Sequence, residues 1–447
     1  MKIIIVGAGK VGSELSINLV KEGNDVTLID KSLELLEDIA SKIDLQTIHG
    51  NGAHPKILES AEAHKADMLI AVSKSDETNM IACQVAYTVF GIKTKIARIR
   101  DLEYLNYESL FANESSLIDF TISPELITSN YIKKLITFQG INQIFNFYEN
   151  ENCLINIIYK ENNNTNNSIN FYQSACENFN VKICAFIRLN KLYSLEDNDI
   201  LQDKDEILIL CKEEHISKIT KLFNNNKINK RIMIAGGGNI GMHLCESISK
   251  NFQVKVIESN NDRAEYLSEF LNDAIVIHGN SSNEDVLLEE NIEHMDVFCA
   301  LTNDDEANIL SAMMAKKLGA KTVISIIDKL SYSDLLEKGK IDIAVSPENL
   351  TMGALLTHIR KETILKTHTL MGNQIELLEF KIKYKEKAKI IGKNTKQLNL
   401  PKNIVNCCII RNNNFIFDIS NTVIEENDHL IYLVDKKDIK QIEEIFT

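Results

Sequence analysis

Short apolar runs alternate with helical stripes through the first part of the chain. The apolar runs are residues 3–6, 26–29, 68–72 and 96–99. After the first run, Val11, Leu15 and Leu19 recur at the spacing of one helix face, and Met80–Phe90 has a helical pattern as well. Strands that alternate with helices predict a parallel sheet covered by helices on both faces.

The following segment has a different pattern. Short apolar runs such as Val181–Ile187 and Glu206–Cys211 are separated by polar stretches rich in turn-forming residues. This pattern predicts a small module of antiparallel strands, closed by a helix.

The whole arrangement is repeated. Gly7–Gly12 recurs as Gly236–Gly241, and Ser75–Asn79 recurs as Asp304–Asn308 at the same offset. From Ile122 onward the offset is shorter, so the first copy holds extra residues, which we place in a loop near Tyr104–Leu117. A repeat of this length indicates tandem duplication of a two-domain unit rather than a solenoid.

The sequence therefore predicts an α/β protein of two tandem units. Each unit is a Rossmann-like, doubly wound parallel-sheet domain followed by a small α+β domain. The predicted parallel-sheet domains are residues 1–122 and 229–348, and the predicted small domains are 140–224 and 368–447.

Each copy carries a Gly-x-Gly-x-x-Gly pattern that follows an apolar strand and opens a helix, which is the context of a dinucleotide-binding loop. The first glycine permits the tight turn, the second lets a pyrophosphate approach the backbone, and the third allows close packing of helix on strand. The glycines are Gly7, Gly9 and Gly12 in the first copy and Gly236, Gly238 and Gly241 in the second. The alternative for either copy is a glycine turn without a ligand.

An acidic residue ends the second strand of each copy, namely Asp30 and Glu258. A carboxylate at this place accepts hydrogen bonds from ribose hydroxyls and repels a 2′-phosphate, which favours NAD(H) or an adenosine nucleotide over NADP(H). We expect Asp30→Ala to weaken NAD(H) binding at the first site. Because the carboxylate ends a strand at an open crevice, we expect that change to affect stability little.

Further candidate ligands follow later strands at the same edge of the sheet. Ser73 and Lys74 end the fourth strand of the first copy, and Thr302 and Asn303 take their place in the second. The alternative is that these are ordinary loop residues. Arg98 can reach a phosphate, whereas the aligned position holds Ile326, so two occupied sites would not be chemically equivalent.

Composition narrows the function classes. With 49 basic and 63 acidic residues the net charge is −14, which disfavours nucleic acid as a partner. No apolar stretch approaches the roughly 18–20 residues of a membrane span, and the N-terminus does not have the pattern of a signal peptide. The nine cysteines contain no Cys-x-x-Cys pair, which indicates reduced, buried thiols of a cytosolic protein.

Catalytic and metal-binding patterns are missing from the sequence. His49 and His278 repeat, but no nucleophile or general base repeats beside them. No His-x-x-x-His or Glu-x-x-His pattern indicates a metal site. We therefore expect no enzyme activity; the alternative is an NAD-dependent oxidoreductase.

The whole chain resembles the regulatory proteins of Trk potassium uptake, the TrkA family, which contain two tandem RCK units. The string Ser75–Ala86 carries the resemblance more specifically than the glycine loops do. Other resembling segments are 7–12, 26–30, 50–55, 66–72, 96–100, 234–241, 300–306 and 341–347. Gly279–Asn283 departs from the Gly-Asp-x-Thr-Asp-like run that is usual in the family. The resemblance therefore does not extend to the nucleotide selectivity of the second site.

The resemblance implies two pockets for NAD(H) and for adenine nucleotides such as ATP and ADP. The implied ligands are Gly7, Ala8, Gly9, Lys10, Val11, Asp30, Ser73, Lys74 and Arg98 in the first site, and Gly236, Gly237, Gly238, Asn239, Ile240 and Glu258 in the second. It also implies a peripheral protein on the cytoplasmic face of the inner membrane, partnered with a potassium-translocating membrane subunit like TrkH or TrkG. Regulation of a different cation transporter is the alternative.

The resemblance further implies a ring of eight nucleotide-binding domains from four chains. The sequence adds that the helices at Met80–Phe90 and Ile309–Leu318 have apolar residues on more than one face, including Met80, Val85, Val89, Phe90, Met313 and Met314. We expect part of this surface to pack against a neighbouring domain; the alternative is burial within each helix's own domain.

Overall fold

The computed structural model has two parallel sheets and two antiparallel sheets. The residues that it describes are 1–107, 110, 117–147, 151–161, 167–177, 179–189, 191–195, 199–223, 230–328, 340–359, 364–370, 375–382, 390–398, 400–401 and 404–446. Much of the Tyr104–Leu117 loop and the predicted boundaries at 224 and 229 lie outside these residues.

The first parallel sheet has the strand order β3-β2-β1-β4-β5-β6. Its strands are β1 (Lys2–Val6), β2 (Asp25–Asp30), β3 (Gln46–His49), β4 (Met68–Ala71), β5 (Thr94–Arg98) and β6 (Phe120–Ile122). Its helices are α1 (Lys10–Lys21), α2 (Leu33–Ala40), α3 (Pro55–Ser60), α4 (Asp76–Thr88) and α5 (Leu102–Asn106), followed by α6 (Pro124–Thr137). Ile3, Ile4 and Ile5 of β1 are all fully buried, which requires cover on both faces of the sheet.

The second parallel sheet repeats this order as β14-β13-β12-β15-β16-β17. Its strands are β12 (Arg231–Ala235), β13 (Gln253–Glu258), β14 (Ala274–His278), β15 (Val297–Ala300), β16 (Thr322–Ile326) and β17 (Ile343–Val345). Its helices are α9 (Asn239–Ile248), α10 (Asn261–Phe270), α11 (Glu284–Glu289) and α12 (Asp305–Lys317), and α14 (Pro347–Ile359) follows. In both sheets the strand order reverses between the first and fourth strands, which are neighbours, and this switch point places a crevice at their carboxyl ends.

The two small modules share one antiparallel topology. The first sheet has the order β10-β9-β11-β8-β7 and the second β18-β19-β22-β20-β21. The first contains β7 (Ile141–Phe147), β8 (Asn152–Ile158), β9 (Lys182–Arg188), β10 (Lys191–Ser194) and β11 (Glu206–Lys212), with helices α7 (Ile169–Glu177) and α8 (Ile216–Phe223). The second contains β18 (Ile364–Thr369), β19 (Ile375–Lys381), β20 (Val405–Arg411), β21 (Asn414–Ile416) and β22 (His429–Asp435), with helix α15 (Ile439–Phe446). The predicted fold class, including the closing helices, is confirmed.

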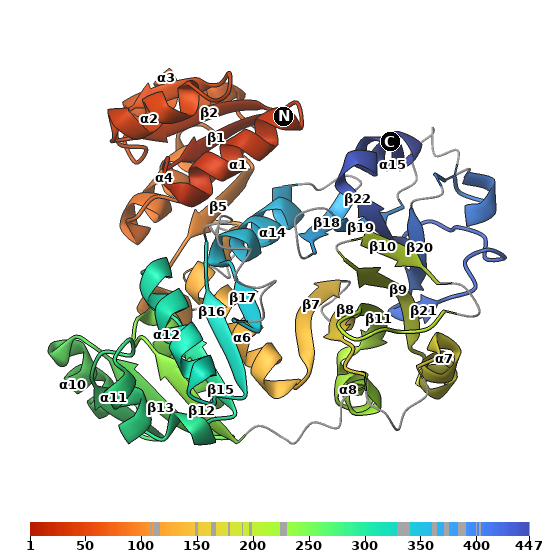
Figure 1. Cartoon of the computed structure of the whole chain (residues 1–447). Helices are drawn as coiled ribbons and strands as arrows, with labels where there is room; N and C mark the ends of the chain where they lie inside the picture. The colour runs from red at the N-terminus through yellow and green to blue at the C-terminus, as the bar shows by residue number, and fades with distance from the viewer. Residues whose placement is uncertain are drawn as a thin grey trace. The chain divides into compact units, whose positions relative to one another are not determined.

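The small modules pack against each other through a common core, and their sheets lie side by side in Figure 1. Phe147 and Leu154 of the first module join Leu377 and Leu433 of the second in this core. The repeat-related residues Cys184 and Cys407 both lie in this core. All nine cysteines are free and buried, as the sequence predicts.

By its internal contacts the chain divides into two compact units. The first comprises Met1–Thr128 with Ser346–Leu355, and the second comprises Ser129–Val345 with Leu356–Thr447. This division does not coincide with four separate domains, so the four boundaries predicted from the sequence stay a prediction. Among the described residues, no helix is long and apolar enough to cross a membrane.

The apolar residues that are exposed on α4 and α12 are mostly not the ones that the sequence led us to expect. Most of the residues named above, such as Met80 and Met313, pack against the core of their own sheet, and only Val89 is exposed. The exposed side chains are instead Ile81, Tyr87 and Val89 next to the first sheet, and Leu310, which repeats Ile81, next to the second. Periodicity alone does not tell which face of a helix its own sheet covers.

A polar pair that is at least partly buried occupies repeated positions in the small modules, but its chemistry differs between them. In the first module Asn156 Nδ2 donates to Glu206 Oε2 at 2.6 Å. In the second module the same places hold Glu379 and His429, whose Oε1 and Nδ1 are 2.7 Å apart. Burial raises the pKa of Glu206 above its ordinary value, and the bond from Asn156 opposes that shift.

We expect Glu206→Gln to flatten the dependence of stability on pH. A raised pKa means that the folded chain holds this proton more tightly than the unfolded chain, so stability falls as pH rises through the raised pKa. The glutamine keeps an acceptor for Asn156, and the variant should be more stable than the wild type at neutral pH and equal to it near about pH 4. Urea unfolding across this range measures the difference, and parallel curves for the two proteins would contradict it.

Candidate nucleotide site

The glycine loop of each parallel sheet has the geometry that a tight strand-to-helix turn requires. Gly7 has φ of 111° and Gly236 has φ of 105°, a region that favours glycine. A Cβ on Gly7 would lie 2.8 Å from the backbone nitrogen of Ser73, so the loop is packed directly against the end of β4. A Cβ on Gly12 would overlap the carbonyl oxygen of Gly7, and one on Gly241 would overlap that of Gly236.

The second glycine of each loop faces open space. Gly9 and Gly238 are the N-caps of α1 and α9, and a Cβ on either would meet no atom within 4 Å. Lys10 and Val11 form the first turn of α1, and Asn239 and Ile240 form that of α9. The N-terminus of such a helix presents backbone N–H groups to an anion.

The predicted ribose-binding acids hold the glycine loops in this structure. Asp30 Oδ2 accepts from the backbone N–H of Ala8 at 2.6 Å, and its Oδ1 accepts from that of Ser32 at 2.7 Å. Glu258 repeats the arrangement with Gly237, at 2.7 Å, and with Asn260, at 2.8 Å. Each carboxylate therefore joins the glycine loop to the start of the next helix.

The repeated histidines have a structural explanation. His49 Nε2 lies 2.9 Å from the carbonyl oxygen of Lys31, and His278 Nε2 lies 3.1 Å from that of Ser259. Each histidine thus contacts the residue that follows the acid. Its recurrence without a neighbouring nucleophile follows from this backbone contact.

A buried asparagine that sequence reasoning missed ties the strand ends together. Asn79 Oδ1 accepts from the N–H of Ser73 at 2.9 Å, and its Nδ2 donates to the carbonyls of Ser73, at 3.2 Å, and Arg98, at 2.9 Å. Asn308 makes the equivalent bonds to Thr302 and Ile326. The signal was available, because this asparagine ends both repeated strings, Ser75–Asn79 and Asp304–Asn308. Lys74 and Asn303 are exposed beside these ties.

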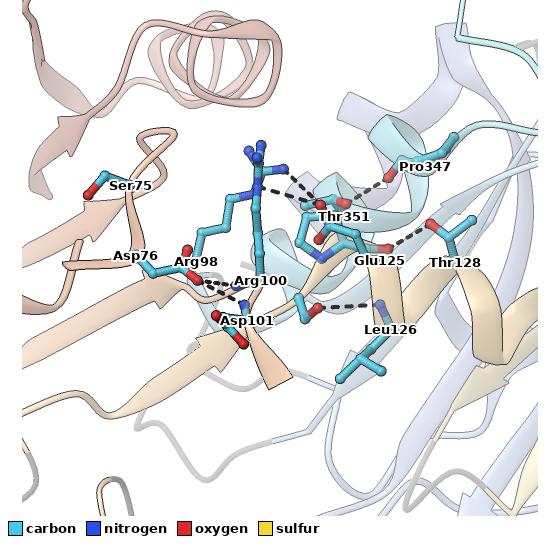
Figure 2. Close-up of polar contacts among 12 residues, drawn as sticks. Ser75, Asp76, Arg98, Arg100, Asp101, Glu125, Leu126, Thr128, Pro347 and Thr351 are labelled. Carbon is cyan, nitrogen blue, oxygen red and sulfur yellow. Dashed lines mark hydrogen bonds and ion pairs between the residues drawn. The ribbon is translucent and has the colours of Figure 1, made fainter. Parts of the chain in front are cut away.

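Arg98 ends β5 at the same edge and lies in a cluster of charges. Its Nη2 is 3.5 Å from Glu125 Oε1, and the Nε of Arg100 is 3.5 Å from the same oxygen. Figure 2 shows the two arginine side chains converging on the Glu125 carboxylate. Burial, and next the Arg100 guanidinium, lower the pKa of Arg98 below its ordinary value, and Glu125 opposes the shift.

The backbone of this cluster is anchored by Asp76, the first residue of α4. Asp76 Oδ2 accepts from the backbone N–H groups of Arg100, at 2.8 Å, and Asp101, at 2.9 Å. Sequence reasoning did not name Asp76, Arg100 or Glu125 as site residues, because their contacts join strand and helix ends that are distant along the chain.

The second site differs from the first in its cations. Ile326, at the place of Arg98, is a buried strand residue. The cation nearest the second loop is Arg263, whose Nε donates to the carbonyl of Gly237 at 2.9 Å and whose guanidinium lies over the ring of Tyr266. Across the described part of the chain, no group of three or more His, Cys, Asp or Glu residues is arranged to hold a metal ion.

Two segments of the chain, residues 3–124 and 232–347, match the TrkA-N domain. The chain is 39% identical to the Trk system potassium uptake protein TrkA of Vibrio alginolyticus over 451 aligned residues, which cover 100% of this chain and 98% of the relative. The chain belongs to the TrkA family. The TrkA protein of Haemophilus influenzae has the same identity and coverage, and that of Halomonas elongata is 37% identical.

Solved RCK structures share the TrkA-family fold seen here. The GsuK RCK domain aligns with a TM-score of 0.64 at 14% sequence identity, covering 100% of this chain and 94% of that one. The GsuK channel bound to NAD aligns with a TM-score of 0.63 at 14% identity, covering 100% of this chain and 78% of that one. At this identity the likeness concerns the fold alone.

Proposed function

We propose that this TrkA-family chain is a non-enzymatic regulatory subunit of a Trk-type potassium uptake system. Its two glycine loops bind NAD(H) or an adenine nucleotide such as ATP or ADP. Nucleotide occupancy changes the conformation of the protein and thereby gates a separate potassium-translocating membrane subunit like TrkH or TrkG. The protein works as a peripheral subunit on the cytoplasmic face of the inner membrane.

The main support is that both loops combine an open second glycine with a helix N-terminus. Gly9 and Gly238 leave the space that a pyrophosphate needs, and α1 and α9 direct their first N–H groups to that space. The assignment to a potassium uptake system rests on the names of relatives that align with the whole chain. Structures of the related fold are described as bound to NAD and to ADP, which agrees with a nucleotide as the ligand.

The proposed first ligand set is Gly7, Ala8, Gly9, Lys10, Val11, Gly12, Asp30, Ser73, Lys74 and Arg98. The proposed second set is Gly236, Gly237, Gly238, Asn239, Ile240, Gly241, Glu258, Thr302 and Asn303.

A nucleotide can shift a gate only if it binds one conformation better than another. An affinity difference of about 5- to 150-fold corresponds to about 1–3 kcal/mol of coupling, which such a contact set can supply.

We propose that four chains form a ring of eight nucleotide-binding domains. The exposed Ile81 and Leu310, at repeated places on α4 and α12, are suited to such packing. Light scattering tests the assembly, and a monomer at micromolar concentration with and without NADH would rule out the ring.

Single-atom additions at the open glycines test the nucleotide proposal. Gly9→Ala and Gly238→Ala keep backbone angles that alanine adopts, with φ of −68° and −63°, so both variants should unfold like the wild type. Each added Cβ stands where the pyrophosphate would lie, and we expect each variant to lose at least about tenfold in affinity at its own site, about 1.4 kcal/mol. Calorimetric titration with NADH, ATP and ADP measures both sites.

The physiological part of the proposal needs a transport measurement. A bacterium that lacks its own Trk regulator but retains the membrane subunit should recover potassium uptake with the wild-type chain and not with the Gly9→Ala, Gly238→Ala double variant. Steady oxidation of NADH over a panel of hydroxy acids and amino acids would instead support the oxidoreductase alternative. Co-purification of a different transporter would redirect the proposal to that partner.

A further inference from the structure

The charge cluster at the end of β5, formed by Arg98, Arg100 and Glu125, has buried side-chain atoms whose hydrogen bonds are not made. The Arg98 and Glu125 side chains are each 14% exposed, and their closest approach is 3.5 Å. Charge-assisted N–H···O bonds are about 2.7–2.9 Å long, so this ion pair is stretched. Glu125 Oε2 and Arg98 Nε are buried and have no hydrogen-bond partner among the described residues.

The two guanidinium groups of the cluster have one carboxylate partner between them. Arg98 and Arg100 share one carboxylate, because Asp76 is engaged with the backbone N–H groups of Arg100 and Asp101 rather than with a guanidinium. Two guanidinium groups that share one carboxylate oxygen are better matched by a phosphate, which offers more acceptor oxygens.

The cluster is connected to the glycine loop through Ser73 and Asn79. Gly7 packs on Ser73, and Asn79 bonds to the backbone of both Ser73 and Arg98. Arg98 therefore ends its strand at the edge of the sheet where the glycine loop lies. A phosphate group bound at this edge would meet the guanidinium that Glu125 contacts.

Glu125 belongs to a helix whose first turn this contact helps to hold. It is the second residue of α6, and Leu126 and Ile127 donate their N–H groups to the Oγ and carbonyl oxygen of Ser123, at 3.3 and 3.0 Å. Along α6 the chain passes from the first compact unit into the second.

We propose that Glu125 is an intramolecular competitor for ligand phosphate: it occupies Arg98 and Arg100 in the free chain, and a phosphate that takes its place releases the first turn of α6. This inference rests on the proposed function, since it describes regulation of the first nucleotide site. The second copy lacks the device, because Ile326 stands at the position of Arg98 while Glu348 repeats Glu125.

The test compares the affinities of Glu125→Gln and wild type for ADP and for inorganic pyrophosphate by calorimetry. If the contact with Glu125 is closed for nine-tenths of the time, its removal should tighten binding about tenfold. Asp101→Asn is the control, because it also removes one negative charge beside Arg100 while keeping a side-chain cap for α5. It measures the effect of lost charge alone and should change affinity less than about twofold. Glu348→Gln should match the wild type.

Amide hydrogen exchange distinguishes this competitor role of Glu125 from a purely structural one, which predicts no change on ligand binding. Saturating ADP should speed exchange at the Leu126 and Ile127 amides of the wild type, and Glu125→Gln should show the faster exchange without ligand. If Glu125→Gln does not fold, Glu125→Asp, which withdraws the carboxylate from both arginines, should give the same direction of change.

The outcomes separate this inference from the proposed function. Nucleotide binding with equal or weaker affinity in Glu125→Gln overturns the competitor and leaves the proposed function standing. If neither NADH, ATP nor ADP binds, the proposed function fails, and pyrophosphate alone decides: tighter binding by Glu125→Gln than by Asp101→Asn supports the competitor, and any other result overturns it.

Discussion

Gly12→Ala is expected to lower the free energy of unfolding of the first compact unit by about 3 kcal/mol, the upper end of the range for overpacked sites. The added Cβ would overlap the carbonyl oxygen of Gly7, which is backbone and cannot rotate away as a flexible side chain would. The strand-to-helix turn would have to open, so the first nucleotide site should be lost together with stability. Urea unfolding followed by circular dichroism measures the effect in a chain that has no tryptophan.

Gly9→Ala is the matched control for Gly12→Ala, since it adds the same methyl group to the same loop where no atom lies within 4 Å. Equal stability of the two variants would show that the third glycine is not in close contact with the turn. Gly241→Ala should reproduce the loss in the second parallel sheet, because its Cβ would overlap the carbonyl oxygen of Gly236.

Asp30→Ala is expected to destabilise the first compact unit by about 2–4 kcal/mol as well as to weaken nucleotide binding at the first site by about 1–3 kcal/mol. The carboxylate accepts from two backbone N–H groups, those of Ala8 and Ser32, and alanine leaves both without this acceptor. The sequence alone led to the expectation of little change in stability. The structure leads us to expect a larger change, because the acid also holds the glycine loop.

Asp25→Ala controls for loss of a carboxylate from the same strand. Asp25 is exposed at the other end of β2, and its replacement should change stability by less than about 0.5 kcal/mol. Calorimetric titration with NADH and urea unfolding on the same preparations separate the two effects of Asp30. Unchanged affinity in a stable Asp30→Ala variant would refute the assignment of Asp30 to the ribose.

The sequence was sufficient for features that local pattern encodes. The alternation of strand and helix is visible in the sequence, because the period of a strand or helix depends on nearby residues. The spacing of residues along the chain also shows the repeat, the glycine loops and the acids at Asp30 and Glu258. The antiparallel modules and their closing helices followed from the same patterns. The family resemblance added the expectation of a nucleotide.

Only the tertiary structure decided which groups meet. The bond of Asn79 to Arg98, the convergence of Arg98 and Arg100 on Glu125, and the core shared by Cys184 and Cys407 each bring together residues that are distant in sequence. The exposed face of α4 was misjudged for the same reason. A pattern of apolar positions indicates which type of element forms. Which face of that element is covered, and by which partner, depends on how sheets and helices pack, and that packing leaves no periodic signal in the sequence.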